Sequence, residues 1–217
     1  MTVSQIVAGR RRALLDEFTK GFPPLVEVEG PAGLAGLMHL DEFDSSGAAG
    51  PVGRRRMDNV MMVPGRPGAP HSASVWVRAS YTDYREAYAA FLHAAYGLTA
   101  RPADLMPYDI DHLLNRARAG TGTALLRIEA LPLAANRQWG SFLEKLASQA
   151  TVAGNARTRR LMSYLIAGKV AGLAPPASLT DLPGRATLAR GIAALGLPLH
   201  EVQTGLDNML DHIARNL

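Results

Sequence analysis

The sequence contains no cysteine. A disulfide scaffold, a cysteine-ligated zinc site, an iron–sulfur cluster and a thiol nucleophile are therefore all excluded. The sequence also has no apolar run of about 18 residues or more, the length that a membrane-spanning helix needs. The basic segment Met1–Arg12 lacks the apolar stretch of a secretory signal. We therefore expect a cytoplasmic protein without membrane contact; export by a signal-independent secretion system would leave no trace of this kind.

Charged residues are also few, at 19% of the 217 residues. Lys and Arg number 23 and Asp and Glu number 19, which gives a formal net charge of +4. This excess is a weak indication of a polyanionic partner. Hydrophobic residues make up 47%, which is typical of a folded globular protein, and the 21 glycines and 14 prolines indicate long connecting loops.

Changes in composition divide the chain into three regions. We expect residues 1–100 to form an α/β region, residues 101–150 to carry the chemistry, and residues 151–217 to form helices packed on the central region. Within the first region the sequence predicts a helix over 6–18 and strands over 25–29, 59–63 and 73–79. The role of this region stays open between a recognition domain, a docking segment for export and a part of the core.

A stripe of aromatic and apolar side chains lies on a predicted helix that ends at Gly97. The stripe has helical spacing and consists of Tyr84, Ala87, Tyr88, Phe91, Leu92 and Ala95. Such a stripe packs into a core far more often than it stacks on nucleic-acid bases, so we predict core packing. Near the end of the chain, a second amphipathic helix is predicted from Leu206, Met209, Leu210 and Ile213.

The central region has the pattern strand, loop, strand, helix. An alternating segment ends in Asp111 and His112, and a polar loop follows over 115–123. The apolar segment 124–131 predicts a second strand that returns against the first. A helix is then expected to begin near Asn136.

Three side chains of this unit suit phosphodiester hydrolysis. His112 is a candidate general base, because an imidazole titrates near neutral pH. Asp111 and Asn136 carry hard oxygen atoms, which suit Mg²⁺ rather than zinc. The hairpin can place these oxygens on one side and the imidazole on the other, so that the base activates water while the metal neutralises the charge on the leaving oxygen. Three arginines flank the site and are candidates for holding phosphates: Arg116, Arg118 and Arg137.

The motif Asp-Ile-Asp-His ends at His112, and the pair Asn-Arg begins 24 residues later at Asn136. This pattern resembles the HNH nucleases of the His-Me finger (ββα-metal) superfamily. The likeness is to the HNH domains of large RNA-guided DNA-cutting enzymes and to the nuclease domains of bacterial toxins. The resemblance implies that His112 activates water and that Asp111 and Asn136 hold one Mg²⁺, or another divalent cation such as Mn²⁺. It covers about a fifth of the chain, and neither flank is recognised.

The chain departs from the family pattern in two places. Many members have a third metal-binding His late in the finger helix, where this sequence has Glu144 and Lys145. Glu144 is either an oxygen ligand or a solvated helix residue. The family often carries a middle Asn in the loop, and Asn115 lies too early for that role. An inactive descendant, or a buried His paired with Asp in a structural role, therefore stays as an alternative.

Two arginine runs offer further phosphate contacts. They are Arg10–Arg12 and Arg54–Arg56. Each run either grips a nucleic-acid backbone or simply forms solvated surface, and the second is the commoner case.

These observations together predict an α+β fold in which a ββα finger is embedded in a mostly helical body with a small N-terminal sheet. The predicted function is a metal-dependent endonuclease that hydrolyses DNA with low sequence specificity. The alternative is a non-catalytic basic binding or assembly protein that retains an inactive finger. By analogy, a stand-alone finger of this kind suits an antibacterial toxin, with a cognate inhibitor or immunity protein as a second partner, or a mobile-element enzyme.

Overall fold

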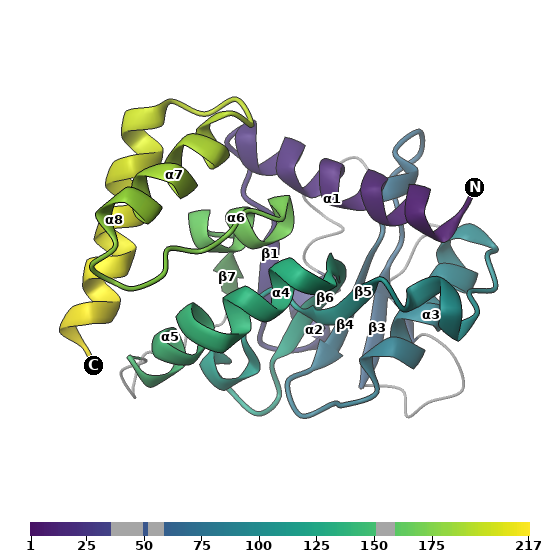
Figure 1. Cartoon of the computed structure of the whole chain (residues 1–217). Helices are drawn as coiled ribbons and strands as arrows, with labels where there is room; N and C mark the ends of the chain where they lie inside the picture. Colours follow the sequence, from purple (N-terminus) through teal and green to yellow (C-terminus); the bar gives the residue numbers. More distant parts are fainter. Residues whose placement is uncertain (36–49, 52–58, 151–158) are drawn as a thin grey trace.

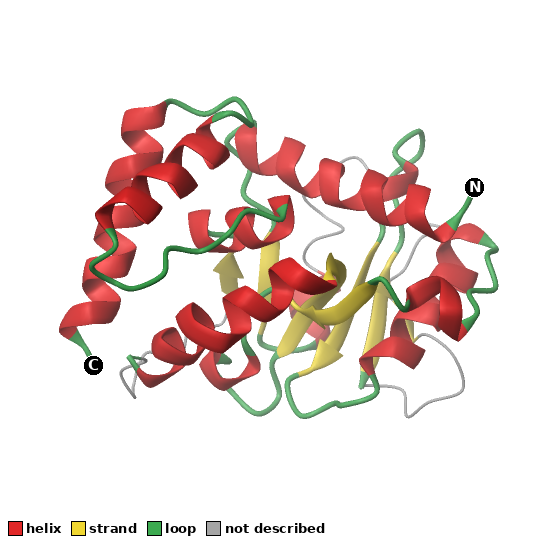
Figure 2. Ribbon diagram, viewed as in Figure 1, coloured by secondary structure: helices red, strands yellow, loops and turns green. Residues whose placement is uncertain are grey.

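The protein has an α+β fold in which helices cover a curled antiparallel sheet (Figures 1 and 2). The structure is a computed structural model that describes residues 1–35, 50–51, 59–150 and 159–217. Within these ranges seven strands form one sheet in the order β2-β3-β4-β6-β1-β7, with β5 pairing to β6. The strands are β1 Leu25–Val28, β2 Gly50–Pro51, β3 Val60–Val63, β4 Ser74–Arg78, β5 Tyr108–His112, β6 Leu125–Pro132 and β7 Arg159–Leu161.

The helices surround this sheet. They are α1 Val3–Thr19, α2 Pro31–Ala35, α3 Tyr84–Tyr96, α4 Leu133–Trp139, α5 Lys145–Gln149, α6 Tyr164–Ala171, α7 Leu182–Ala193 and α8 Leu199–Arg215. A π-helical turn over Gly140–Glu144 joins α4 to α5. Figure 1 shows α7 and α8 together at one end of the molecule and α3 toward the other end, with α1 running along the top between them. No helix in the described ranges is both long and apolar enough to cross a membrane.

Strand β6 is the centre of the sheet. It is buried at every position except Pro132, which is partly buried, and its first half lies between β1 and β4. Its second half pairs with β5, with Asp111 opposite Glu129. The prediction of a small N-terminal sheet was therefore wrong in its extent. Strand β6 pairs directly with β1 and β4 of the first region and with β5 of the central region, and β7 of the third region joins the same sheet through β1.

The described residues form several hydrophobic clusters, of which two bear on the site. Residues of α1, α3, β4 and β6 pack together, among them Ile6, Val75, Phe91 and Ile128. A second core joins Trp139 and Leu143 to the C-terminal helices. This packing places the C-terminal helices against the segment that begins with α4.

The aromatic stripe lies in the first core, as predicted. Tyr88, Phe91 and Leu92 are fully buried, so the rings of Tyr88 and Phe91 are not available for base stacking. Helix α3 ends where Gly97 takes a left-handed conformation with φ of 64°, which glycine adopts without strain.

The first arginine run belongs partly to the interior. Arg10 is fully buried and pairs with Glu129 at 2.5 Å, and Arg11 donates to the carbonyl of Val170 at 2.7 Å. Arg10 is therefore neither solvated surface nor a phosphate contact. The second run, Arg54–Arg56, lies outside the described residues.

Candidate functional site

The predicted order of strand, strand and helix is present as β5, β6 and α4. Helix α4 begins at Leu133, three residues earlier than predicted, because Pro132, the last residue of β6, is also the N-cap of the helix. Asn136 therefore lies within the first turn of α4 instead of opening it. This turn starts where β6 ends, beside the neighbouring strand β5.

Alternation along β5 separates the carboxylates from the imidazole. Successive side chains of a strand point to opposite faces, so Asp109 and Asp111 share one face and His112 lies on the other. Asp111 contacts Lys169 of α6, while the His112 ring contacts the Tyr84 ring of α3. The structure thus places the acid and the base on opposite sides of the strand, as expected from the hairpin.

The structure brings Asn136 to the two aspartates of β5. Its amide nitrogen donates to Asp109 Oδ2 at 3.4 Å, and the amide also lowers the pKa of Asp111 by hydrogen bonding. The amide oxygen of Asn136 is buried and has no hydrogen-bond partner among the described residues. A buried polar atom without a protein partner is rare, and this oxygen keeps its capacity to accept a hydrogen bond or to ligate a cation.

Asp111 is ionised at neutral pH. Burial acts to raise the pKa of its carboxyl, but the ammonium of Lys169 and the neighbouring His112 and Asn136 outweigh that effect and hold the pKa below its usual value. One oxygen, Oδ1, accepts from the backbone N–H of His112 at 2.8 Å. The other, Oδ2, accepts from Lys169 at 3.2 Å.

His112 is almost completely buried, with 2% of its surface exposed. The Tyr84 ring lies edge-on to it, with the ring centroids 4.6 Å apart. Burial lowers the pKa of His112 from 6.5 to about 4. The Asp111 carboxylate acts to raise this pKa, and the positive charges of Lys169 and Arg116 act to lower it further. Its Nε2 is buried without a hydrogen-bond partner in the described structure. The ring is therefore neutral at pH 7, which leaves it able to accept a proton but makes it a weak base.

The depressed pKa predicts a loss of stability in mild acid. Between pH 6.5 and 4 the unfolded state binds a proton on His112 that the folded state does not, so stability falls as the pH decreases through this window. We expect the free energy of unfolding to drop by roughly 1–2 kcal/mol more in the wild type than in His112→Gln between pH 7 and pH 5. Urea unfolding at the two pH values measures the difference, and equal losses in both proteins would contradict the assignment.

A buried ion cluster adjoins Asp111. Lys169 Nζ contacts Glu144 Oε1 at 2.6 Å and Asp111 Oδ2 at 3.2 Å, and Lys169 is 2% exposed. Glu144 is thus an ion-pair partner inside a polar cluster and not a solvated helix residue. Burial raises the pKa of Glu144, although the ammonium of Lys169 acts in the opposite direction.

Local packing explains how Lys169 and Glu144 come into contact. Glu144 ends the π-helical turn, a feature that is common at functional sites. Helix α6 approaches α4 closely at Gly168, where an added Cβ would lie 3.1 Å from Trp139. Sequence analysis missed Lys169, and the signal that could have found it is a single charge inside the apolar run 165–173.

The three predicted phosphate contacts differ in their surroundings. Arg116 is exposed on a 3-10 turn that Asn115 caps by accepting from the N–H of Ala117. The Arg137 side chain is 70% exposed and lies 3.7 Å from Asp109. Arg118 folds inward, and its Nε is buried without a hydrogen-bond partner in the described chain. Two of the three are therefore free to meet a phosphate.

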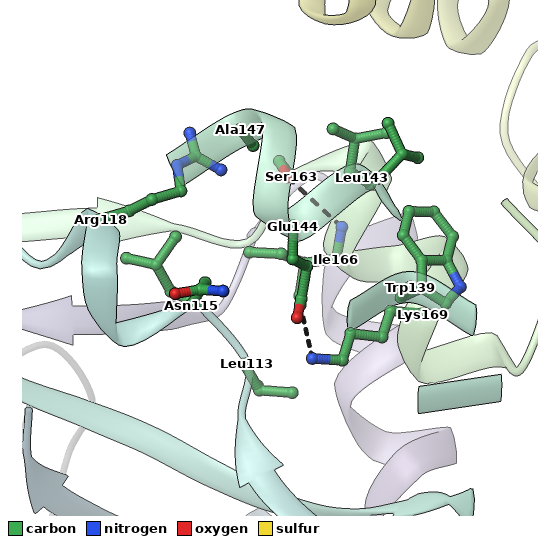
Figure 3. Close-up of a pocket in the computed structure, with 12 residues that line it drawn as sticks. Leu113, Asn115, Arg118, Trp139, Leu143, Glu144, Ala147, Ser163, Ile166 and Lys169 are labelled. Carbon is green, nitrogen blue, oxygen red and sulfur yellow. Dashed lines mark hydrogen bonds and ion pairs between the residues drawn. The ribbon is translucent and has the colours of Figure 1, made fainter. Parts of the chain in front are cut away.

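A cavity of about 30 Å³ adjoins the ion cluster. Figure 3 shows Lys169 and Glu144 joined across its wall, with Arg118 and Asn115 on the side of the 3-10 turn. Apolar side chains, among them Leu113, Trp139, Leu143 and Ile166, line the rest.

The polar groups therefore form a site around Asp111, with the imidazole behind it. In the ranges that the structure describes, no group of three or more His, Cys, Asp or Glu side chains has the arrangement of a metal site. A metal ion held by Asp111 and Asn136 would have one carboxylate oxygen, the amide oxygen and solvent or substrate as its ligands. A scan against protein-family models and searches of curated proteins and of solved structures found no match to this chain.

Proposed function

We propose that this chain is a metal-dependent endonuclease that hydrolyses DNA phosphodiester bonds, with a finger of the His-Me type made by β5, β6 and α4. The observation that carries the proposal is the approach of the Asn136 amide to the aspartates of β5, with the His112 imidazole on the opposite face of the same strand. The unpartnered Asn136 Oδ1 and His112 Nε2 support it, since both are polar atoms that the fold buries without satisfying them.

The donor set fits a divalent cation such as Mg²⁺. The carboxylate of Asp111 and the amide oxygen of Asn136 are hard oxygen ligands, and Mg²⁺ usually keeps several waters beside one or two protein ligands. Asp111 and Asn136 would hold the ion. The ion would supply a positive charge that stabilises the developing charge on the leaving oxygen.

The chain's own residues have the remaining roles. His112 accepts a proton from the attacking water through its neutral imidazole. Arg116 and Arg137 hold the DNA backbone through their exposed guanidinium groups. Tyr84 covers His112, so its ring has to move aside when the substrate reaches the base.

Plasmid cleavage tests this proposal. The wild type is expected to nick supercoiled plasmid in the presence of Mg²⁺ and to stop when EDTA is added. Cleavage that EDTA does not change would refute the metal-dependent mechanism, and the absence of cleavage with Mg²⁺ or Mn²⁺ would refute the nuclease function.

A second candidate is a non-catalytic DNA-binding or assembly protein that retains an inactive finger. The burial of His112 favours it, as does the ammonium that already lies on Asp111. This candidate predicts that the protein binds DNA without cutting it, and that replacement of His112 changes neither binding nor the DNA. The same plasmid assay, combined with a gel-shift measurement, separates the two candidates.

The exposed arginines yield a prediction that both candidates share. Each phosphate contact releases counterions, so the logarithm of the binding constant falls with the logarithm of salt concentration by about 0.9 per contact. We expect the double variant Arg116→Ala/Arg137→Ala to bind duplex DNA with a salt slope smaller by about 1–2 than the wild type. Fluorescence anisotropy over a salt series measures the slope. Arg215→Ala, on α8, serves as the control and is expected to leave it unchanged.

A further inference from the structure

Lys169 lies at the point where oxygen atoms from two parts of the fold converge. Its Nζ contacts Glu144 Oε1 at 2.6 Å, Asp111 Oδ2 at 3.2 Å and the carbonyl oxygen of His112 at 3.3 Å. Two carboxylates and a backbone carbonyl are the oxygen types that Ca²⁺, Mn²⁺ and Mg²⁺ bind in proteins. The ammonium thus occupies a place that suits a metal cation.

One further feature points to a cation near this place. The Asn136 Oδ1 is buried and unpartnered in the described structure, and its amide nitrogen donates to Asp109, two residues before Asp111 on the same face of β5. The carboxylates of the cluster face two cations, since Arg118 also acts on Glu144 and lines the same cavity as Lys169. Displacement of the Lys169 ammonium would therefore leave Arg118 beside Glu144.

The cavity in Figure 3 gives the ammonium a place to move. Lys169 and Glu144 both line it, and it has a volume of about 30 Å³. A cavity of about 10–15 Å³ already holds a water molecule, and an ammonium group is of similar size. The side chain can therefore leave the oxygens by turning about its own bonds, without a change in the backbone of α6.

We propose that Lys169 and a divalent metal ion compete for one cation site formed by Asp111, Glu144 and the carbonyl oxygen of His112. The Lys169 ammonium then blocks metal binding at this site until a metal ion displaces it. The cation site stands on the contacts above, whereas its regulatory meaning rests on the proposed nuclease function. The contact distances of 2.6–3.3 Å are closer to the ~2.3–2.6 Å of Ca²⁺ ligands than to the ~2.0–2.1 Å of Mg²⁺ ligands, so larger ions need less rearrangement.

The test removes the ammonium and measures metal binding. We expect Lys169→Met to bind Mn²⁺, detected by electron paramagnetic resonance, at least about tenfold more tightly than the wild type, because the site then keeps its two carboxylates without the Lys169 ammonium. Ca²⁺ is also expected to raise the unfolding temperature of this variant more than that of the wild type. Lys145→Met, which removes an exposed charge from the adjoining helix, is the matched control and should bind Mn²⁺ as the wild type does.

Three outcomes decide the proposal. Equal Mn²⁺ affinity in Lys169→Met and the wild type would overturn it. If Lys169→Met folds only when Mn²⁺ or Ca²⁺ is added, as followed by circular dichroism, the proposal is supported. If this variant does not fold at all, Glu144→Gln in the otherwise unchanged chain decides, since it should weaken Mn²⁺ binding several-fold and an unchanged affinity would overturn the site.

The failure of this proposal is distinguishable from the failure of the nuclease function. Tighter Mn²⁺ binding by Lys169→Met without DNA cleavage by any variant leaves the cation site standing and removes the nuclease. If the wild type cleaves DNA in a metal-dependent way but Lys169→Met gains no Mn²⁺ affinity, the nuclease function is supported and the competition between Lys169 and the metal ion is refuted.

Discussion

Replacing His112 by alanine is expected to lower the rate of DNA cleavage by about 10²–10⁴-fold, which is the usual contribution of a positioned general base. The imidazole is neutral, and burial leaves its Nε2 with no partner in the described structure, so proton acceptance is the role that its surroundings leave open. Single-turnover cleavage of a labelled duplex with Mg²⁺ measures the rate.

Two controls keep the result specific. His200→Ala removes an exposed imidazole on α8 and should cut as fast as the wild type. Circular dichroism and DNA affinity of the His112 variant show whether it is folded and binds, because the variant also loses the ring contact with Tyr84. A folded His112→Ala protein that cuts at the wild-type rate would exclude His112 as the base.

The largest effect on stability is expected at Arg10. This guanidinium is fully buried, pairs with Glu129 through two hydrogen bonds, donates to the carbonyl of Ala73 and lies 4.4 Å from the centre of the Phe91 ring. It therefore ties α1 to β6, to α3 and to the segment before β4. Replacing Arg10 by methionine is expected to lower the free energy of unfolding by about 3–5 kcal/mol, because Glu129 is left as a poorly compensated buried charge.

The neighbouring Arg127 limits this loss. It contacts Glu129 at 3.2 Å and remains in the variant. The loss of unfolding free energy in Arg10→Met should therefore lie toward the lower end of the expected range. Urea unfolding measures it. The double variant Arg10→Met/Glu129→Gln should recover part of the loss, since the unpaired carboxylate is then gone. A loss of less than about 1 kcal/mol for Arg10→Met would show that this ion pair does not anchor α1.

Hydrophobic patterning was sufficient to locate most elements. The strand predicted over 73–79 is β4, the helix that Gly97 ends is α3, and the second strand of the central region is β6. These segments were predictable because their apolar periodicity matches the way they pack. The single sheet was not predictable, since pairing between strands as distant as β1 and β7 depends on contacts that no local pattern records.

Part of the neighbourhood of Asp111 was predictable from the motif, whereas the role of these residues stays a prediction. The motif named Asp111, His112 and Asn136, and the structure brings the carboxylate and the amide together. The ion cluster was not found, because Lys169 reaches Asp111 from a helix 58 residues later in the chain. The interior role of Arg10 was missed for the same reason, as its partner Glu129 lies 119 residues away.

The central claim is that Asp111 and Asn136 hold a divalent ion beside His112. Paramagnetic broadening by Mn²⁺ in amide NMR spectra of the wild type tests this claim most directly. We predict that substoichiometric Mn²⁺ broadens the amide signals of Asp111, His112 and Asn136 first, and that Asn136→Ala weakens this broadening. Broadening confined to exposed acidic residues such as Asp207 and Asp211 on α8, with the signals of β5 and α4 unchanged, would contradict it.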